Sequence, residues 1–281
     1  VIGERFTLAL GGGGGRGWAH IGVARALDEA GMRPSLIVGT SMGAIVGAGL
    51  AAGFSPDQIE KVAVRTPVYR LLGRPARLAM FDPRPLLERL AAELGDPLIE
   101  ELPTRFAVST YDLDSGRAVA ITSGRLIDAV RRSISVPLFF PPCPDAEGIW
   151  CDAGSWESVP VSHARQLSTD PVIGVWVDVP KPGILAARPV ASVLRGISRG
   201  LSARGGRRLT ARRYLGLLTA RLAEPVVKLE PDLLIRPRLG VSQAWRFGRV
   251  SLMSSLGYHD ARAALLPLRA GDVSRAGHAA T

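Results

Sequence analysis

A serine between two glycines is the residue with the clearest chemical potential in this sequence. Ser41 lies in GTSMG, residues 39–43, after an apolar and β-branched run at 36–38 and before a run of glycine and alanine. A strand, a tight turn and a helix would leave no room for side chains at Gly39 and Gly43, and would expose the serine hydroxyl beside a helix N-terminus. The pattern predicts a nucleophile elbow.

The elbow lies in a stretch without charge between Arg33 and Asp57. Its length would allow a membrane span, since about 20 apolar residues cross a bilayer. However, the glycines at 39, 43, 47, 49 and 53 make it only weakly hydrophobic. We therefore expect a buried strand, an elbow and a buried helix instead of a span.

Five glycines at 11–15, followed by Arg16 and Gly17, separate a predicted strand from a predicted helix. Successive glycine N–H groups near a helix start can bind an anion. A dinucleotide site would need an acidic residue at the next strand end, and a P-loop would need a lysine, and neither is present. With a nucleophile candidate close by in the sequence, we favour an oxyanion hole.

Asp152 is the carboxylate that best matches this nucleophile. It follows a short predicted strand at 149–151 and precedes Ala153 and Gly154. Such a position suits a functional carboxylate in an α/β fold, although a lone aspartate is more often a turn residue. A Ser, Asp, His order could instead use His163 or His259 as the base.

These segments occur in an order that resembles the patatin-like phospholipase family, specifically its bacterial single-domain members. GGGGRGWAHIGV is similar to the Gly-rich block of that family, GTSMG to its serine elbow and DAG to its aspartate box. STYDLDSGR and RRSISVPLFFPP also resemble stretches between elbow and aspartate. The resemblance covers roughly residues 5–180.

The resemblance implies a serine–aspartate dyad without histidine. Ser41 would be the nucleophile and Asp152 the base. The remaining site residues carried over are the oxyanion donors Gly12, Gly13 and Gly14, the loop supports Arg16 and Gly17, the elbow glycines Gly39 and Gly43, and the aspartate box Ala153 and Gly154. One departure is Trp156-Glu157-Ser158, where the family usually has asparagines before a proline–valine pair.

The function implied is a serine acyl-ester hydrolase acting on lipids, of the phospholipase A or lysophospholipase type. The two cysteines, Cys143 and Cys151, match no metal-binding spacing, and no calcium loop is visible, so we expect no metal and no organic cofactor. An acyltransferase with the same dyad, or a membrane-associated regulatory protein, would be alternatives.

The net charge of +10 is concentrated in one segment. Residues 179–223 hold ten Lys or Arg and no acid, and the remaining 25 Lys and Arg balance 25 Asp and Glu. This asymmetry indicates an anionic partner, and Tyr214 as the segment's only aromatic argues against nucleic acid. We expect contact with an anionic membrane surface, against the alternative of a solvated segment.

Strands alternating with helices indicate an α/β fold, a layered sheet flanked by helices and related to the α/β-hydrolase architecture. We expect a single domain over 1–281, with a core at about 5–180 plus C-terminal elements and a basic insertion or lid at about 180–223. Glu4 and Arg5 argue against a secretion signal, so we expect a cytoplasmic protein, peripheral to the inner membrane face if the basic segment binds lipid. A start at Val1 suggests processing, so an upstream segment could be missing.

The local patterns predict the following elements: strands at 6–10, 36–38, 149–151 and 171–179; a hairpin at 105–122 turning at 114–116; and helices at 17–31 ending at Gly31, 42–53, 55–63 with Ser55 and Gln58 as a capping box, 82–95 capped by Asp82, and 123–133 capped by Ser123.

Overall fold

The computed structural model describes residue 2 and residues 5–73, 79–177, 201–202, 208–222, 229–240 and 246–276. Within them, one mixed sheet of eight strands runs in the order β10-β7-β1-β2-β3-β6-β5, with β4 also paired to β3. The strands are β1 (Arg5–Leu10), β2 (Arg33–Thr40), β3 (Arg105–Asp112), β4 (Arg117–Ile121), β5 (Cys143–Pro144), β6 (Ile149–Asp152), β7 (Val172–Val175) and β10 (Leu233–Ile235). Two short strands, β8 (Leu201–Ser202) and β9 (Arg208–Leu209), pair separately.

Strands β10, β7, β1, β2 and β3 are parallel to their neighbours, whereas β4, β6 and β5 join antiparallel. The predicted strands and the hairpin are confirmed, with two differences in extent. Strand β2 extends beyond the predicted 36–38, and β7 covers only Val172–Val175 of the predicted 171–179, of which residues 178–179 lie outside the described residues. Parallel pairing brings the carboxyl ends of β1 and β2 to one edge of the sheet, which is where ligand sites form in open α/β folds.

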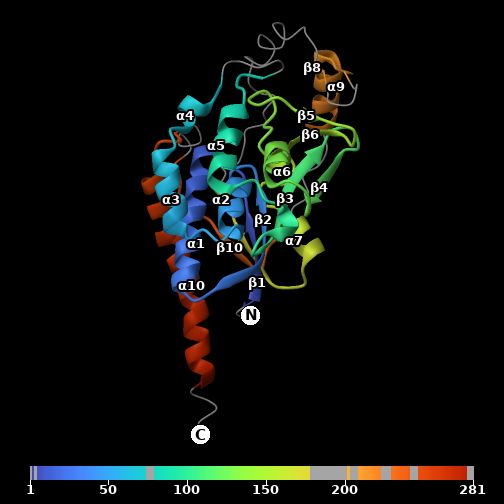
Figure 1. The fold of residues 1–281 in the computed structure, drawn as a ribbon. Coiled ribbons are helices and arrows are strands. Elements are labelled where there is room, and N and C mark those ends of the chain that lie inside the picture. The colour runs from blue at the N-terminus through green and yellow to red at the C-terminus, as the bar shows by residue number, and fades with distance from the viewer. Residues whose placement is uncertain are drawn as a thin grey trace.

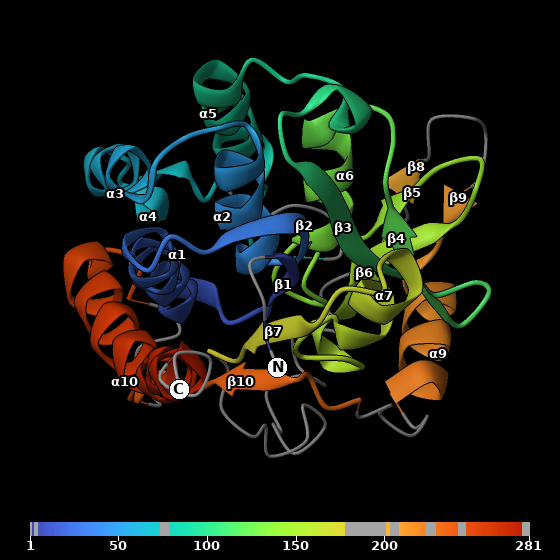
Figure 2. The same cartoon turned by 90° about the horizontal axis from the view of Figure 1, so that it is seen from below.

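Helices cover both faces of the sheet, as predicted from the alternation of elements. They are α1 (Ala19–Glu29), α2 (Met42–Ala51), α3 (Pro56–Arg65), α4 (Val68–Leu71), α5 (Arg84–Leu94), α6 (Leu126–Ser133), α7 (Val161–Leu167), α9 (Ala211–Leu222) and α10 (Val250–Ala276), with 3-10 turns η1 (Gly14–Trp18), η2 (Ile99–Glu101) and η3 (Ala153–Ser155). Figure 2 shows α1 and α10 on one side of β7 and β10 and α7 on the other. The end of α10 extends below the rest of the fold in Figure 1, and α4 lies near its top.

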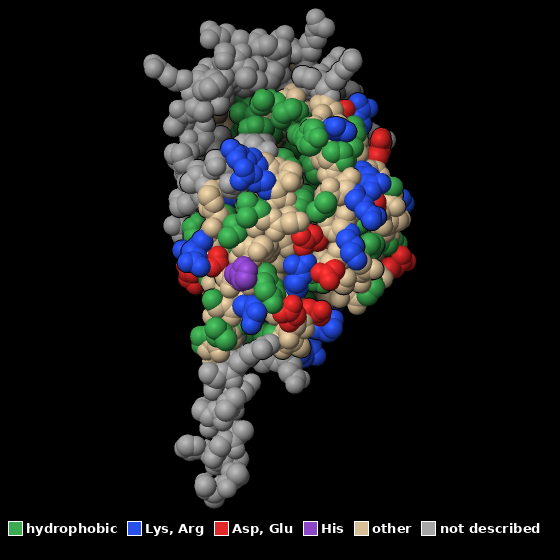
Figure 3. Space-filling view, turned by 90° about the vertical axis from the view of Figure 1, so that its left-hand side faces the viewer, with side chains coloured by type: hydrophobic (Ala, Val, Ile, Leu, Met, Phe, Trp, Pro, Cys, Tyr) green, Lys and Arg blue, Asp and Glu red, His purple; other side chains and the backbone are tan. Residues whose placement is uncertain are grey.

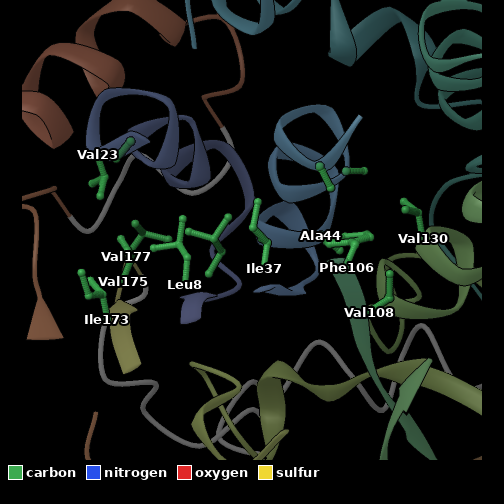
Figure 4. Packing of buried hydrophobic residues seen from close by; sticks show 14 of the residues in the cluster. Leu8, Val23, Ile37, Ala44, Phe106, Val108, Val130, Ile173, Val175 and Val177 are labelled. Carbon is green, nitrogen blue, oxygen red and sulfur yellow. The ribbon is translucent and has the colours of Figure 1, made fainter. Parts of the chain in front are cut away.

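The main core fills the space between the sheet and helices α1, α2 and α6. Leu8, Ile37 and Phe106 point from neighbouring strands toward Val23 of α1 and Ala44 of α2 (Figure 4), and all five are buried. A second cluster under α7 covers the opposite face with Val38, Ala107 and Ala164 among its members. The charge-free stretch supplies β2 and α2 to this core, which confirms the prediction of a buried strand and helix. Among the described residues, no helix is long and apolar enough to cross a membrane.

Helix α10 packs directly on α1, the helix that follows the Gly-rich loop. A Cβ added at Gly22 would lie 1.8 Å from the Ser254 carbonyl oxygen, so this crossing requires glycine. The Trp18 indole N–H also donates to the Phe247 carbonyl oxygen at 2.9 Å. The end of the chain therefore holds the start of α1 in place.

One of the three predicted helix N-caps, Ser55, is confirmed. Ser55 and Gln58 form the predicted capping box. The Gln58 N–H donates to the Ser55 hydroxyl at 3.3 Å, and the Ser55 N–H donates to Gln58 Oε1 at 2.8 Å. The prediction that Asp82 caps α5 is wrong by one residue: Pro83 occupies the N-cap position, and Asp82, one residue earlier, accepts the N–H of Arg84 at 3.0 Å.

The prediction that Ser123 caps α6 is wrong. The helix begins at Leu126, and Asp96, from the loop after α5, accepts the Ile127 N–H at 2.9 Å. Arg125 also pairs with Asp96 at 2.6 Å, which fixes that carboxylate at the helix start. The cap comes from a distant segment, where a local pattern cannot show it.

Most of the predicted basic insertion at 180–223 lies outside the described residues. Its last part forms α9, which packs Tyr214 and Leu218 against the end of the sheet. Arg213 pairs with Asp114 at 2.7 Å, and Arg221 donates to the Leu113 and Asp114 carbonyl oxygens. Two of the ten basic residues thus hold α9 on the β3–β4 hairpin.

Candidate active site

Ser41 occupies a strained elbow between β2 and α2. Its backbone has φ 54° and ψ −120°, in the region that residues with a side chain rarely adopt. A Cβ at Gly39 would lie 2.5 Å from the Gly43 carbonyl oxygen, and one at Gly43 would lie 2.2 Å from the Leu10 carbonyl oxygen. The turn therefore has the geometry that the G-x-S-x-G pattern predicts.

A buried hydroxyl that the sequence reasoning missed supports this elbow. The Ser41 N–H donates to Ser133 Oγ at 2.8 Å, and that hydroxyl donates to the Ser109 carbonyl oxygen at 2.7 Å. Ser133 is fully buried. It lies at the end of α6 in the RRSISVPLFFPP stretch, and the only sequence signal for it was the resemblance of that stretch to the family.

Strand pairing brings Asp152 to the elbow. Strand β4 pairs with one edge of β3, and both β2 and β6 use the other edge, where they meet end to end. Thr40, the last residue of β2, pairs with Ser109, while Asp152, the last residue of β6, pairs with Thr110. Thr40 and Asp152 therefore pair with two consecutive residues of β3. Ser41, which follows Thr40, is in this way brought next to Asp152, although 110 residues lie between the two in the chain.

The Asp152 carboxylate is held by its own turn. Oδ1 accepts the Gly154 N–H at 2.7 Å, and the Asp152 N–H donates to the Ser135 carbonyl oxygen at 3.1 Å. Ala153 and Gly154 form the 3-10 turn η3. The side chains of Ser41 and Asp152 are only slightly exposed, since the residues retain 8% and 5% of their accessible surface.

The Gly-rich loop passes directly over the elbow. A Cβ at Gly12 would lie 3.3 Å from Ser41 Cβ. The Gly12 N–H donates to the Ser158 carbonyl oxygen at 3.1 Å, so in this conformation it is engaged elsewhere. No acceptor is found within the described part of the chain for the N–H groups of Gly13 and Gly14. Met42 supplies a further amide, because the first N–H groups of a helix have no intrahelical acceptor.

Arg16 and Gly17 complete the loop as the turn η1 before α1. Arg16 is 4% exposed, and its N–H donates to the Gly13 carbonyl oxygen at 3.3 Å. Gly17 packs against Met42, since a Cβ there would lie 2.3 Å from Met42 Cγ. The loop and the helix after the nucleophile are therefore in contact.

The two buried histidines, His20 and His163, have structural partners away from the cavity. His20 is fully buried and donates from Nε2 to the Gly11 carbonyl oxygen at 2.8 Å, and burial lowers its pKa to about 4 despite this bond. His163 Nδ1 lies 3.1 Å from Ser109 Oγ, and burial lowers its pKa as well. His259 lies exposed on α10, and His278 is outside the described residues. None of the three described histidines lines the cavity beside Ser41.

An apolar cavity of about 300 Å³ opens beside Ser41 and Asp152. The catalytic candidates and the Gly-rich loop form one part of its wall. The rest is lined mainly by hydrophobic side chains from α2 to α5 and from the segment after α6, including Met42, Ile45, Phe54, Ile59, Val62, Val68, Leu72, Leu86, Leu90, Leu94, Ile134, Val136, Phe139 and Phe140. Such a lining suits a hydrocarbon chain.

The residues that depart from the family pattern after the aspartate box have defined structural roles. Trp156 stacks on Tyr111 with 3.8 Å between ring centroids, and its indole N–H donates to the Arg221 carbonyl oxygen at 2.8 Å. Glu157 accepts the Ser162 N–H at 2.8 Å at the start of α7. Trp156 thereby links the loop after Asp152 to α9.

The site shows no arrangement for a metal within the described residues, where no group of three or more His, Cys, Asp or Glu comes together. Cys151 is buried beside Asp152, and burial raises the pKa of its thiol well above the ordinary value. It is therefore a strand residue that packs with Tyr111 and Trp156, not a thiolate nucleophile.

Comparisons with known proteins agree with this geometry. An uncharacterised NTE family protein of Mycobacterium tuberculosis is 33% identical over 174 residues, which cover 61% of this chain and 48% of the relative. Lysophospholipase nte1 of Emericella nidulans is 30% identical over 187 residues, covering 62% of this chain and 12% of that protein. The chain thus spans about half the length of its mycobacterial relative and less of the fungal one.

The fold has a solved counterpart in VipD from Legionella pneumophila. The two align with a TM-score of 0.56 and 14% identity, over 93% of this chain and 66% of VipD. The family described as patatin-like phospholipase matches residues 8–165, which include the Gly-rich loop, the elbow and the aspartate box. The chain belongs to the patatin-like phospholipase family.

Proposed function

We propose that this protein is a serine acyl-ester hydrolase that acts on lipids through a Ser41–Asp152 dyad, of the phospholipase A or lysophospholipase type. The observation that carries the proposal is the apolar cavity, which has Ser41, Asp152 and the Gly-rich loop in its wall. Family membership and the relative named a lysophospholipase support a lipid substrate.

In the proposed reaction, Asp152 takes the proton of the Ser41 hydroxyl as the oxygen attacks the ester carbonyl. The Gly154 N–H donates to Asp152 Oδ1 and so holds this carboxylate in place at the end of β6. The negative charge on the carbonyl oxygen would be stabilised by the N–H groups of Gly13, Gly14 and Met42. The alcohol then leaves with the proton, and water attacks the acyl-serine and releases the fatty acid.

Arg16 would add a positive charge close to this oxyanion loop while its backbone N–H holds the Gly13 carbonyl. The strained elbow would keep the serine oxygen at the wall of a largely apolar cavity, where electrostatic interactions are stronger than in water. No step of the proposed reaction needs a metal ion or an organic cofactor.

The fatty chain would occupy the apolar part of the cavity, while the headgroup side would remain near the Gly-rich loop. The basic segment at 180–223 is proposed to bring the enzyme to anionic membranes, where such a substrate resides. Arg213 and Arg221 are already engaged on the hairpin, so the arginines before α9 are the ones to test.

A fluorophosphonate probe tests the nucleophile directly. We expect the probe to label Ser41, identified by peptide mass spectrometry, and expect Ser41→Ala and Asp152→Asn to abolish release of fatty acid from phospholipid and lysophospholipid. His259→Gln, an exposed and distant substitution, is the matched control and should retain full activity. A label on another residue, or an active Asp152→Asn protein, would contradict the dyad.

The same incubation separates hydrolysis from acyl transfer. A lysolipid acceptor is added, and the products are resolved by mass spectrometry. Free fatty acid as the main product supports the hydrolase. A diacyl product formed in preference to fatty acid would assign the same dyad to an acyltransferase instead.

A further inference from the structure

We propose that the outer face of α3 and α4, together with residue 80, docks this protein on an anionic lipid surface above the cavity. This docking face consists of the exposed side chains of Lys61, Val64, Arg65, Tyr69, Arg70 and Met80. The docking face is separate in sequence from the basic segment at 180–223. The proposal concerns the surface through which the protein binds lipid and goes beyond the ester chemistry proposed above.

The segment that carries the docking face has two sides of opposite exposure. Its inner side, which includes Val62, Val68 and Leu72, lines the apolar cavity. On its outer side, Val64 and Tyr69 are 59% and 60% exposed. A single layer of chain therefore separates the cavity from the outside, so lipid at this face would lie next to the space that its acyl chain is to enter.

Met80 extends the face along the cavity wall. It is 43% exposed, and its N–H donates to the Leu138 carbonyl oxygen at 2.9 Å. The next residue, Phe81, pairs in the same way with Phe139, whose side chain lines the cavity. Movement of residues 80–81 would therefore be transmitted to the wall of the cavity beside Ser41.

The charge of this region fits an anionic surface. From the start of α3 to residue 84 the sequence holds six Lys or Arg and three acids. Asp57 and Glu60 pair with Arg25 of α1, at 2.9 Å and 2.6 Å, and Asp82 pairs with Arg84. Arg70 lies 5.6 Å from the centre of the Tyr69 ring, so a cation and an aromatic side chain are presented together. Figure 3, which views this side of the molecule, shows hydrophobic side chains gathered at the upper end with Lys and Arg beside them.

Exposed apolar side chains interleaved with cations favour a bilayer over the other partners considered. Tyrosine, methionine and valine can enter the headgroup region while the cations remain at the level of the phosphates. A basic partner surface would be repelled by this face, and a second copy of the chain would bring two positive faces together.

Vesicle co-sedimentation tests the proposal in a Ser41→Ala background, so that no lipid is hydrolysed during the measurement. The vesicles are phosphatidylcholine with or without phosphatidylglycerol. The charge variant is Lys61→Gln/Arg65→Gln/Arg70→Gln, and the apolar variant is Tyr69→Ala/Met80→Ala.

Each variant has a control of the same kind elsewhere on the surface. Arg5→Gln/Arg33→Gln/Arg262→Gln removes the same charge at the amino ends of β1 and β2 and on α10. Leu266→Ala removes an apolar side chain that is 62% exposed, close to the value for Tyr69.

The parent protein should bind vesicles with phosphatidylglycerol more tightly than neutral ones, and salt should weaken that binding. A cation near an anionic surface contributes about 5-fold in binding, or about 1 kcal/mol, so the charge variant should lose roughly 100-fold. The apolar variant should bind both kinds of vesicle more weakly, and the controls should match the parent.

Four results would overturn the proposal. The first is a charge variant that binds vesicles as well as its control does, and the second is a parent protein that binds neutral vesicles equally well or binds neither kind. The third is a loss of binding that occurs only when arginines in 180–223 are replaced. The fourth is a dimer, seen in sedimentation velocity, that the Tyr69→Ala/Met80→Ala variant no longer forms. Hydrolysis of a monomeric short-chain ester, measured with Ser41 restored, should be unchanged in both variants. Failure of that reaction in the wild-type chain would count against the proposed function and not against docking.

Discussion

Replacing Ser133 by alanine should weaken the elbow that carries the nucleophile. The substitution removes one oxygen that accepts the Ser41 N–H and donates to the Ser109 carbonyl oxygen. Ser133 is fully buried, so the N–H of Ser41 would lose its acceptor in a place that water does not reach. Leaving such a group unsatisfied costs about 1–3 kcal/mol, and we expect the free energy of unfolding to fall by that amount.

Turnover should fall as well, because the same hydrogen bond maintains a strained backbone. A residue held at φ 54° stores about 1–3 kcal/mol that the surroundings must offset. If the lost hydrogen bond lets the elbow relax, the competent geometry becomes less populated by a similar free energy. The expected loss in turnover is therefore about 5- to 150-fold.

The assay pairs urea unfolding with the rate of fluorophosphonate labelling and the turnover of a monomeric ester. Ser135→Ala is the matched control, since Ser135 is equally buried but donates its hydroxyl to the Arg131 carbonyl oxygen one turn earlier, at 2.9 Å. We expect Ser133→Ala alone to slow labelling of the folded protein. Wild-type labelling and turnover in Ser133→Ala, or equal losses in the two variants, would refute the reasoning.

Two further predictions concern the Gly-rich loop and the buried histidine behind it. Gly14→Val, at a position with φ 56°, should redirect the loop amides and lower turnover by about 10²–10³-fold while a cooperative unfolding transition persists; full activity would assign the loop another task. His20, with a pKa lowered to about 4, stays neutral when folded, so the unfolded chain binds more protons between about pH 6.5 and pH 4. Stability should therefore fall by about 3 kcal/mol as the pH drops through that window, and His20→Gln should flatten this dependence in urea unfolding measured across it; an unchanged slope would exclude His20 as its source.

The elbow could be predicted from sequence because its determinants are local. Glycines flanking Ser41, an apolar β-branched run before it and a glycine–alanine run after it all act within a few residues. The capping box at Ser55 and Gln58 was predictable for the same reason. In each case the steric or hydrogen-bonding requirement is satisfied by neighbours in the chain.

The rest of the site depends on contacts between distant segments. The support of Ser41 by Ser133 spans 92 residues, and a hydroxyl in a helix carries no local mark of that role. The capping of α6 by Asp96 also spans 31 residues at the Ile127 N–H. Strands β2 and β6 meet end to end because both pair with the same edge of β3. The Gly12 N–H bonds to the Ser158 carbonyl oxygen because the two loops pack together. Neither contact could be derived from a pattern of residue types.

The contact between α1 and α10 has a consequence for the order in which the enzyme becomes competent during synthesis. Every residue of the proposed chemistry, from Gly13 to Asp152, leaves the ribosome before α10 does, because chains emerge from the N-terminus onward. Yet the helix after the oxyanion loop rests on α10 at Gly22, and Trp18 bonds to Phe247. We expect a nascent chain that already contains both dyad residues to remain inactive until its last helix has docked, which would keep an enzyme that attacks lipid esters silent while it is still being made.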